Sequence, residues 1–224
     1  MYLKESEITG FVRTRLDELS AEHSDMFLDE VDDRNLDATI ISLVEESLSY
    51  VHQKAAPNLL EGIKVTEESE GVTAKTDSGT GSVDISLGDR KVLRLVSFRS
   101  DDSPIVLTEV VDEDSPKGRM QLNEFARGTY DDPVLVLMAD TADFKPHYVY
   151  YSLKDTGPGS NTRFSLSYYP VPELKTDDNG ENSWFISARL KEAVLNQITG
   201  MTLRSYKDET NASLFFARCA EYLQ

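Results

Sequence analysis

The chain has 224 residues, of which 39% are hydrophobic and 28% are charged, and its net charge at pH 7 is −17. This composition supports a packed core and argues against global disorder. The acidic balance disfavours specific DNA binding and association with anionic membranes, because like charges repel. The length fits one large domain, or one domain with an insertion.

The N-terminal part is predicted to contain two helices, at residues 3–22 and 37–54, each with one apolar stripe. Asn35 or Asp37 is expected to cap the second helix, and Pro57 ends it. An acidic connector joins the two helices. The apolar positions are Ile8, Val12, Leu16 and Leu19 in the first helix and Ile40, Ile41, Val44, Leu48 and Val51 in the second.

From about Leu59 the pattern changes to short segments with partial or strict alternation, which predicts an antiparallel sheet. Segment 105–111 fits a strand or a short helix. Leu122–Ala126 suggests one turn of helix, and Arg127–Pro133 has the composition of a loop. The predicted strands are 62–66, 72–76, 83–87, 92–98, 134–138, 148–153 and 164–169.

The last forty residues are predicted to form a helical hairpin with one buried face on each helix. Gly200 is expected to close the first helix in the left-handed conformation, and residues 175–182 form a polar link into the hairpin. Cys219, the single cysteine, lies on the apolar face and is predicted to be a buried hydrophobe. The stripes are Ile186, Leu190, Ala193, Val194 and Ile198, then Ala212, Phe215, Phe216, Cys219 and Leu223.

The predicted fold class is therefore α+β, with a helical bundle built from both ends of the chain and a β-rich antiparallel insertion. The predicted parts are residues 1–58, 59–172 and 173–224. With one cysteine, no disulfide can form within the chain, so a reducing compartment is expected. No apolar run approaches transmembrane length and the first residues lack a signal-peptide pattern, so no membrane contact is expected.

No catalytic, cofactor or metal site is predicted. His23, His52 and His147 are scattered and do not have the spacing of zinc ligands. The glycine-rich segments match neither the phosphate-binding loop nor the dinucleotide-binding turn.

Two groups of residues are candidates for interactions. The first is an acidic cluster formed by Asp29, Glu30, Asp32 and Asp33, which either is a solvated loop or faces a basic partner. The second is a group of tyrosines on neighbouring predicted strands. Because strand alternation exposes one face, either half of them face a core and half face solvent, or they form a protein interface. Its principal members are Tyr148, Tyr150 and Tyr168, with Tyr151 and Tyr169 beside them.

The layout resembles the head–tail connector (adaptor or ring) proteins of tailed bacteriophages, most closely the portal-proximal ring protein of crAss-like phages. The likeness is carried by the order of helices and strands, the loop Arg127–Pro133, the Tyr-Tyr-Pro-Val-Pro-Glu segment at 168–173 and the closing hairpin. It implies a structural virion protein with no enzymatic activity, found in the neck of the virion and in the host cytoplasm during assembly. Such proteins form a ring of about twelve copies in which each subunit offers two different complementary faces.

The implied partners are copies of itself, the portal protein, further ring or tail proteins, and genomic DNA that passes without sequence-specific binding. An acidic channel wall would repel DNA phosphates and let the genome slide. Two alternatives remain open. One is an acidic inhibitor or DNA mimic that binds a basic enzyme, and the other is a metal-dependent hydrolase built on the acidic loops.

Overall fold

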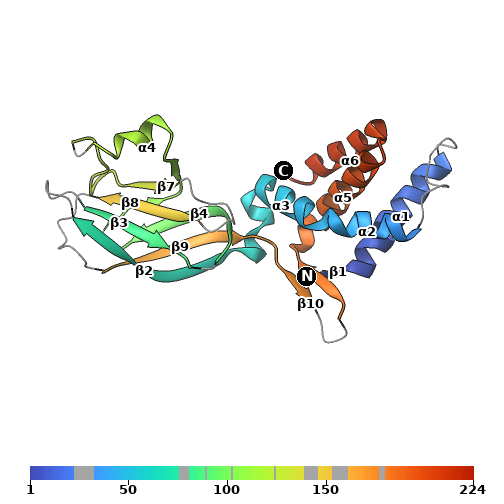
Figure 1. Cartoon of the computed structure of the whole chain (residues 1–224), viewed down its shortest axis with the longest axis horizontal. Coiled ribbons are helices and arrows are strands. Elements are labelled where there is room, and N and C mark those ends of the chain that lie inside the picture. The colour runs from blue at the N-terminus through green and yellow to red at the C-terminus, as the bar shows by residue number, and fades with distance from the viewer. Residues whose placement is uncertain are drawn as a thin grey trace. The chain divides into compact units, whose positions relative to one another are not determined.

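The computed structural model describes residues 1–22, 33–75, 81–88, 90–101, 103–123, 125–138, 146–152, 161–176 and 180–224. The fold is α+β, as predicted, with helices at both ends of the chain and a β-rich middle. The chain forms two compact units (Figure 1). Met1–Ile63 and Pro172–Gln224 make up a helical unit, and Lys64–Val171 make up a β unit. The insertion was expected at 59–172 and comprises 64–171.

The described residues of the helical unit include five α-helices. The helix expected at 37–54 is divided at Leu43 into two helices, yet its apolar stripe continues across the break and is buried in both parts. Two 3-10 turns, Pro57–Leu59 and Glu61–Ile63, follow. The helices are α1 (Glu5–Glu22), α2 (Asp33–Ser42), α3 (Val44–Lys54), α5 (Lys191–Ser205) and α6 (Glu209–Glu221).

Helix α5 is the centre of this unit. It follows a 3-10 turn, Ala188–Leu190, and contacts α1, α2, α3 and α6. Every residue from Ala193 to Gly200 is buried, so the expectation that it would bury only one face is wrong. Two polar residues on it satisfy their hydroxyls within the helix: Thr199 Oγ1 donates to Leu195 O at 2.7 Å, and Thr202 Oγ1 donates to Ile198 O at 2.9 Å.

Gly200 does not end the helix, which continues to Ser205. A Cβ at this position would lie 2.6 Å from Phe216 Cε1 and 3.2 Å from Ala212 O. Glycine is therefore required by the close approach of α6 rather than by a left-handed turn. The left-handed residue of the hairpin is Lys207, with φ of 66°. Cys219 is buried between the helices, as predicted.

A three-stranded antiparallel sheet in the order β1-β11-β10 completes the helical unit. Its strands are β1 (Tyr2–Lys4), β10 (Leu174–Thr176) and β11 (Asn182–Phe185). Of the link expected at 175–182, Lys175 and Thr176 belong to β10 and Asn182 belongs to β11. Gly180 and Glu181 are not strand, and 177–179 lie outside the described residues. The N-terminal amine donates to Ile186 O at 2.8 Å and ties the two ends of the chain together.

The β unit contains an eight-stranded sheet in the order β5-β4-β9-β2-β3-β8-β7-β6. All neighbours are antiparallel except β6 and β7. The strands expected at 62–66 and 72–76 belong to one long strand that begins at Val65, and segment 105–111 supplies two short strands. The strands are β2 (Val65–Lys75), β3 (Gly81–Ser86), β4 (Val92–Ser100), β5 (Val106–Leu107), β6 (Val111–Asp112), β7 (Val134–Leu137), β8 (His147–Ser152) and β9 (Asn161–Pro170).

This sheet is strongly curved. Strands β4 and β8 are separated by three others, so in a flat sheet they would lie about 19 Å apart. Yet the rings of Phe98 on β4 and Tyr150 on β8 have centroids only 5.1 Å apart, and Phe164 on β9 stacks on Phe98 at 5.7 Å. The sheet therefore curls around its inner face, which closes into the main core of the β unit.

Candidate interaction surface

The acidic cluster is mostly beyond the part of the chain that the structure describes. Asp29, Glu30 and Asp32 lie outside the described residues. Asp33 is the first residue of α2, and only its backbone is described. The prediction that this cluster faces a partner stays a prediction.

The tyrosines are core residues. Tyr148, Tyr150 and Tyr168 lie on the inner face of the curled sheet and are almost completely buried. Desolvation by burial raises the pKa of Tyr148 to about 12. Their side chains are therefore not on the surface of the β unit. Tyr151 and Tyr169 are also buried, so the expectation that half of these tyrosines face solvent is wrong.

The remaining titratable candidates are dispersed. His147 is exposed, 3.7 Å from Asp84. His52 is buried in the helical unit with no hydrogen-bond partner on either ring nitrogen, and desolvation lowers its pKa to about 4. Burial raises the pKa of the Cys219 thiol to about 11, which keeps it protonated. Among the described residues, no three His, Cys, Asp or Glu side chains gather as metal ligands would.

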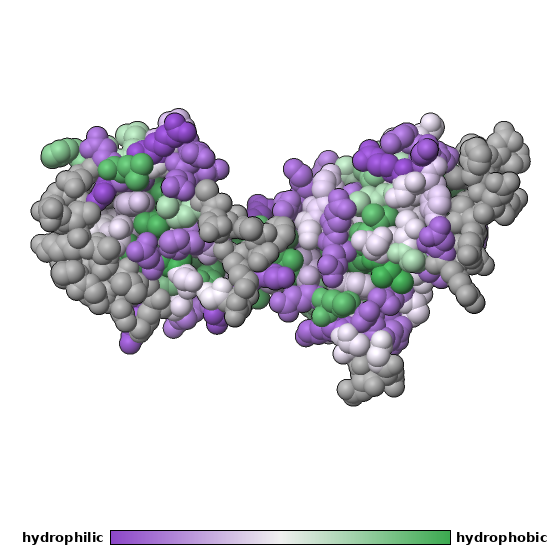
Figure 2. Space-filling view, viewed as in Figure 1, coloured by the Kyte–Doolittle hydropathy of each residue, from purple (hydrophilic) through white to green (hydrophobic). Residues whose placement is uncertain are grey.

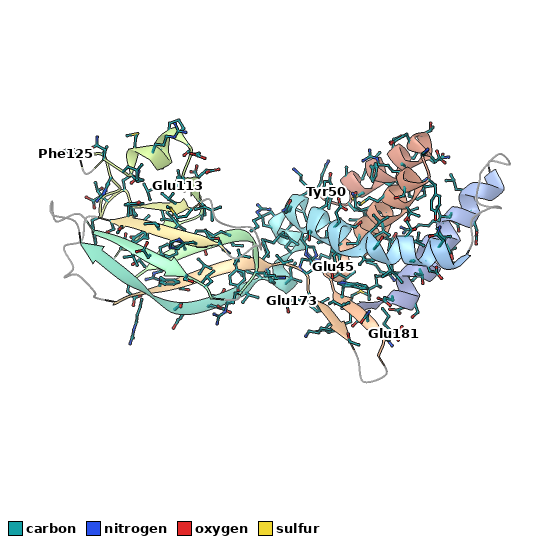
Figure 3. All side chains as sticks on the ribbon, viewed as in Figure 1. Glu45, Tyr50, Glu113, Phe125, Glu173 and Glu181 are labelled. Carbon is teal, nitrogen blue, oxygen red and sulfur yellow. The ribbon has the colours of Figure 1, made fainter. Side chains whose placement is uncertain are left out.

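The most exposed large apolar side chains lie at the end of a short helix, α4 (Pro116–Met120), and in the segment after it. The sequence had suggested a turn of helix at 122–126, where the described residues form turns but no α-helix. Phe125 is 97% exposed, Leu122 is 70% exposed and Met120 is 52% exposed. We call these three residues the apolar tip. Figure 2 shows apolar surface around α4 at the edge of the β unit, and Figure 3 labels Phe125 there. Contiguous exposed apolar patches mark interaction sites in folded proteins, so the apolar tip is the candidate for such a site.

The apolar tip stands on a rigid base, at the centre of which is the buried Gln121. Its Nε2 donates to Lys117 O at 3.0 Å, and its Oε1 accepts from the backbone N–H of Gly128 at 2.7 Å. Its carbonyl oxygen accepts from Arg127 Nε at 2.7 Å. One side chain thus joins both ends of the loop that carries Leu122 and Phe125, which fixes the loop without covering its apolar residues.

Capping and close packing fix the start of the same loop. Ser115 caps α4, since its Oγ accepts from the Gly118 N–H at 3.0 Å and donates to Asp112 O at 2.6 Å. Gly118 packs so tightly that a Cβ would lie 2.1 Å from Asp112 O. Asn123 Oδ1 accepts from the Phe125 N–H at 3.1 Å, which holds the turn before the most exposed residue.

A second, smaller core lies beneath this loop, on the outer face of β7 and β8. Arg127 spans its edge, with its guanidinium 5.8 Å from the centre of the Tyr151 ring. The loop therefore covers one apolar surface and presents another to solvent. The buried members of this core are Val111, Val134, Val136, Val149 and Tyr151.

Sequence reasoning missed the apolar tip because its residues have no helical or strand period. The available signal was the presence of Met120, Leu122 and Phe125 within a polar, turn-rich stretch. A large apolar residue in such a stretch either folds back onto a core or stays exposed, and only the folded chain distinguishes the two.

No helix that the structure describes combines the length and apolar character needed to cross a lipid bilayer. No protein-family model matches this sequence, and no curated protein is detectably similar to it.

Proposed function

We propose that this protein is a structural subunit of the head–tail connector of a tailed bacteriophage, in which copies assemble into a ring that docks on the portal. The observation that carries the assembly role is the apolar tip, with Phe125 97% exposed on a loop fixed by Gln121. Preorganised apolar side chains lose little conformational entropy on binding and suit a permanent interface. The placement in a phage connector rests on the resemblance of the chain layout to that family.

Two further properties support this proposal. The net charge of −17 fits a channel through which DNA passes without adhering. The burial of Tyr148, Tyr150 and Tyr168 removes them as ring contacts and leaves the apolar tip as the preferred contact of the β unit.

The test is negative-stain electron microscopy of the purified protein, alone and mixed with the portal protein of the same virus. Closed rings are expected in at least one of these samples. Leu122→Asp combined with Phe125→Asp should reduce the fraction of rings while the unfolding curve stays unchanged, because both side chains are exposed. A protein that stays monomeric at every concentration and ignores the portal would overturn the proposal, and its capture of a basic DNA-processing enzyme would favour the acidic inhibitor instead.

A further inference from the structure

The β unit also contains an apolar cavity of about 260 Å³ that opens to its surface. Several of its lining side chains, among them Leu93, Leu95 and Val110, are only half-buried, so the cavity leaves apolar surface uncovered. It lies where β4 begins, next to the end of β7 and the start of β8. The lining residues are Val92, Leu93, Arg94, Leu95, Val110, Leu137, Pro146 and Tyr148.

An irregular strand builds this cavity. Four consecutive residues of this strand, Val92 to Leu95, line the cavity. The pairing of β4 with β9 shifts register twice in this stretch, between Val92 and Arg94 and between Leu95 and Ser97. Such bulges re-aim side chains and are typical of functional edges of sheets.

The apolar tip cannot occupy the cavity of its own subunit. Gly128, near the end of the loop that carries the tip, packs closely on β7 and β8. A Cβ on it would lie 2.9 Å from Val134 N and 2.8 Å from Tyr151 O, and these two residues pair with each other. The cavity lies where Leu137 pairs with Tyr148, three residues along the same strand pair, or about 10 Å. The loop also covers the outer face of β7 and β8, whereas Leu137 and Tyr148 belong to the inner face.

The two surfaces are complementary in size and in charge. A cavity of about 150 Å³ accommodates a benzene ring, so this larger one can take the side chain of Phe125. The loop that carries the tip, residues 112–133, has six acidic and three basic residues, a net charge of −3. The cavity lies beside Arg90, Lys91 and Arg94, of which Arg90 pairs with Glu67, and beside Glu109, so these five side chains carry a net charge of +1. Opposite charges around an apolar contact orient the partners.

We infer that the apolar tip of one copy inserts Phe125 into the cavity at the start of β4 in the next copy. This contact joins two different surfaces of the same chain head to tail, which is the kind of interface that closes into a ring. The inference rests on the proposed ring assembly and names the contact that builds it. The occupant is a second copy because one chain supplies both the projecting and the receiving surface, with opposite charges.

The test is cross-linking between two differently tagged pools of the protein, both carrying Cys219→Ser. One pool carries Met120→Cys, which keeps Leu122 and Phe125, and the other carries Glu109→Cys beside the cavity. A short bismaleimide linker is added under the conditions in which wild-type rings form. Cross-linked pairs are expected between the pools and not within either pool.

A second arm shows whether the aromatic side chain makes the contact. Phe125→Asp in the Met120→Cys pool should abolish the cross-link. Leu214→Asp is the matched control, since Leu214 is also an exposed apolar residue, on α6 of the helical unit, and its replacement should leave the cross-link intact.

Three results would overturn the inference. Cross-links within the Met120→Cys pool alone would show a tip-to-tip contact. Rings without cross-links between the pools, or cross-links that survive Phe125→Asp, would place the interface elsewhere and leave the proposed function standing. Failure of the wild-type protein to form rings or bind the portal would overturn both proposals together.

Discussion

The two units of this protein treat their large apolar side chains differently. Among the described residues of the helical unit, the most exposed of them is Leu214, at 51%. Some others there have partners on the surface, such as Phe11, whose ring lies 4.0 Å from Lys191 Nζ. The β unit buries Phe98, Phe164, Tyr148, Tyr150 and Tyr168 inside a curled sheet. It leaves Leu122 and Phe125 exposed on a fixed loop. The helical unit thus leaves its exposed apolar side chains about half covered, whereas the β unit has the two most exposed ones on a single loop.

The largest effect is expected from a comparison of two phenylalanines within the β unit. Phe98 is 1% exposed and packs against Tyr150 and Phe164, so Phe98→Ala should lower the free energy of unfolding by about 3–5 kcal/mol. Phe125→Ala should change it by less than about 0.5 kcal/mol, because the side chain is in solvent. Urea unfolding followed by near-ultraviolet circular dichroism of the tyrosines measures both. A large loss for Phe125→Ala would mean that the tip belongs to the core.

A pH-dependent effect is expected from the interior of the helical unit. Burial lowers the pKa of His52 from 6.5 to about 4, so below pH 6.5 the unfolded chain takes up a proton that the folded chain does not. Stability should therefore fall by about 1.4 kcal/mol per pH unit between pH 6.5 and 4, and by roughly 3 kcal/mol in total.

His52→Leu removes this titration and two unpartnered nitrogens, so at pH 7 it should be neutral or stabilising. The single tryptophan, Trp184, is buried in the helical unit, and its fluorescence reports urea unfolding there. The gap between variant and wild type should widen as the pH falls from 6.5 to 4. If the stabilities of the variant and the wild type instead change in parallel with pH, His52 can be protonated in the folded state.

The smallest effect separates two glycines in helices of the same unit. Gly200→Ala should destabilise by about 1–3 kcal/mol, because the new methyl group would press on Phe216 and on Ala212 O. Gly10→Ala, in the exposed part of α1, meets nothing within 4 Å and should stabilise by about 0.5–1 kcal/mol. Tryptophan fluorescence during urea unfolding checks both signs. Stabilisation by Gly200→Ala would mean that α5 and α6 can separate at no cost.

The tyrosine strands show where sequence reasoning stopped in the β unit. Alternation located β3, β8 and β9, since period two follows from the pleat itself. It also implied that one face of β8 would meet solvent, which is wrong because the loop from Glu113 to Pro133 covers that face. Whether Tyr151 is buried or exposed thus depends on a segment whose sequence has no helical or strand periodicity.

Gly200 shows the same limit of sequence-based prediction in the helical unit. Its sequence context permitted a helix end, and the local signal for a left-handed cap is only a glycine after an apolar stripe. The observed role depends on Phe216, sixteen positions further along the chain, which approaches only once α6 packs on α5.

By itself, the sequence determined the elements that repeat with a fixed period: the stripes of α1, α2, α3 and α6, the existence of α5, the burial of Cys219, and a β-rich insertion between two helical parts. These follow from backbone geometry, which every residue in an element shares. The tertiary structure alone decided how far the sheet curls, which face of β8 is covered, and that Phe125 stays exposed above a cavity-bearing sheet. Each of these depends on segments that meet only after folding, so no local pattern records them.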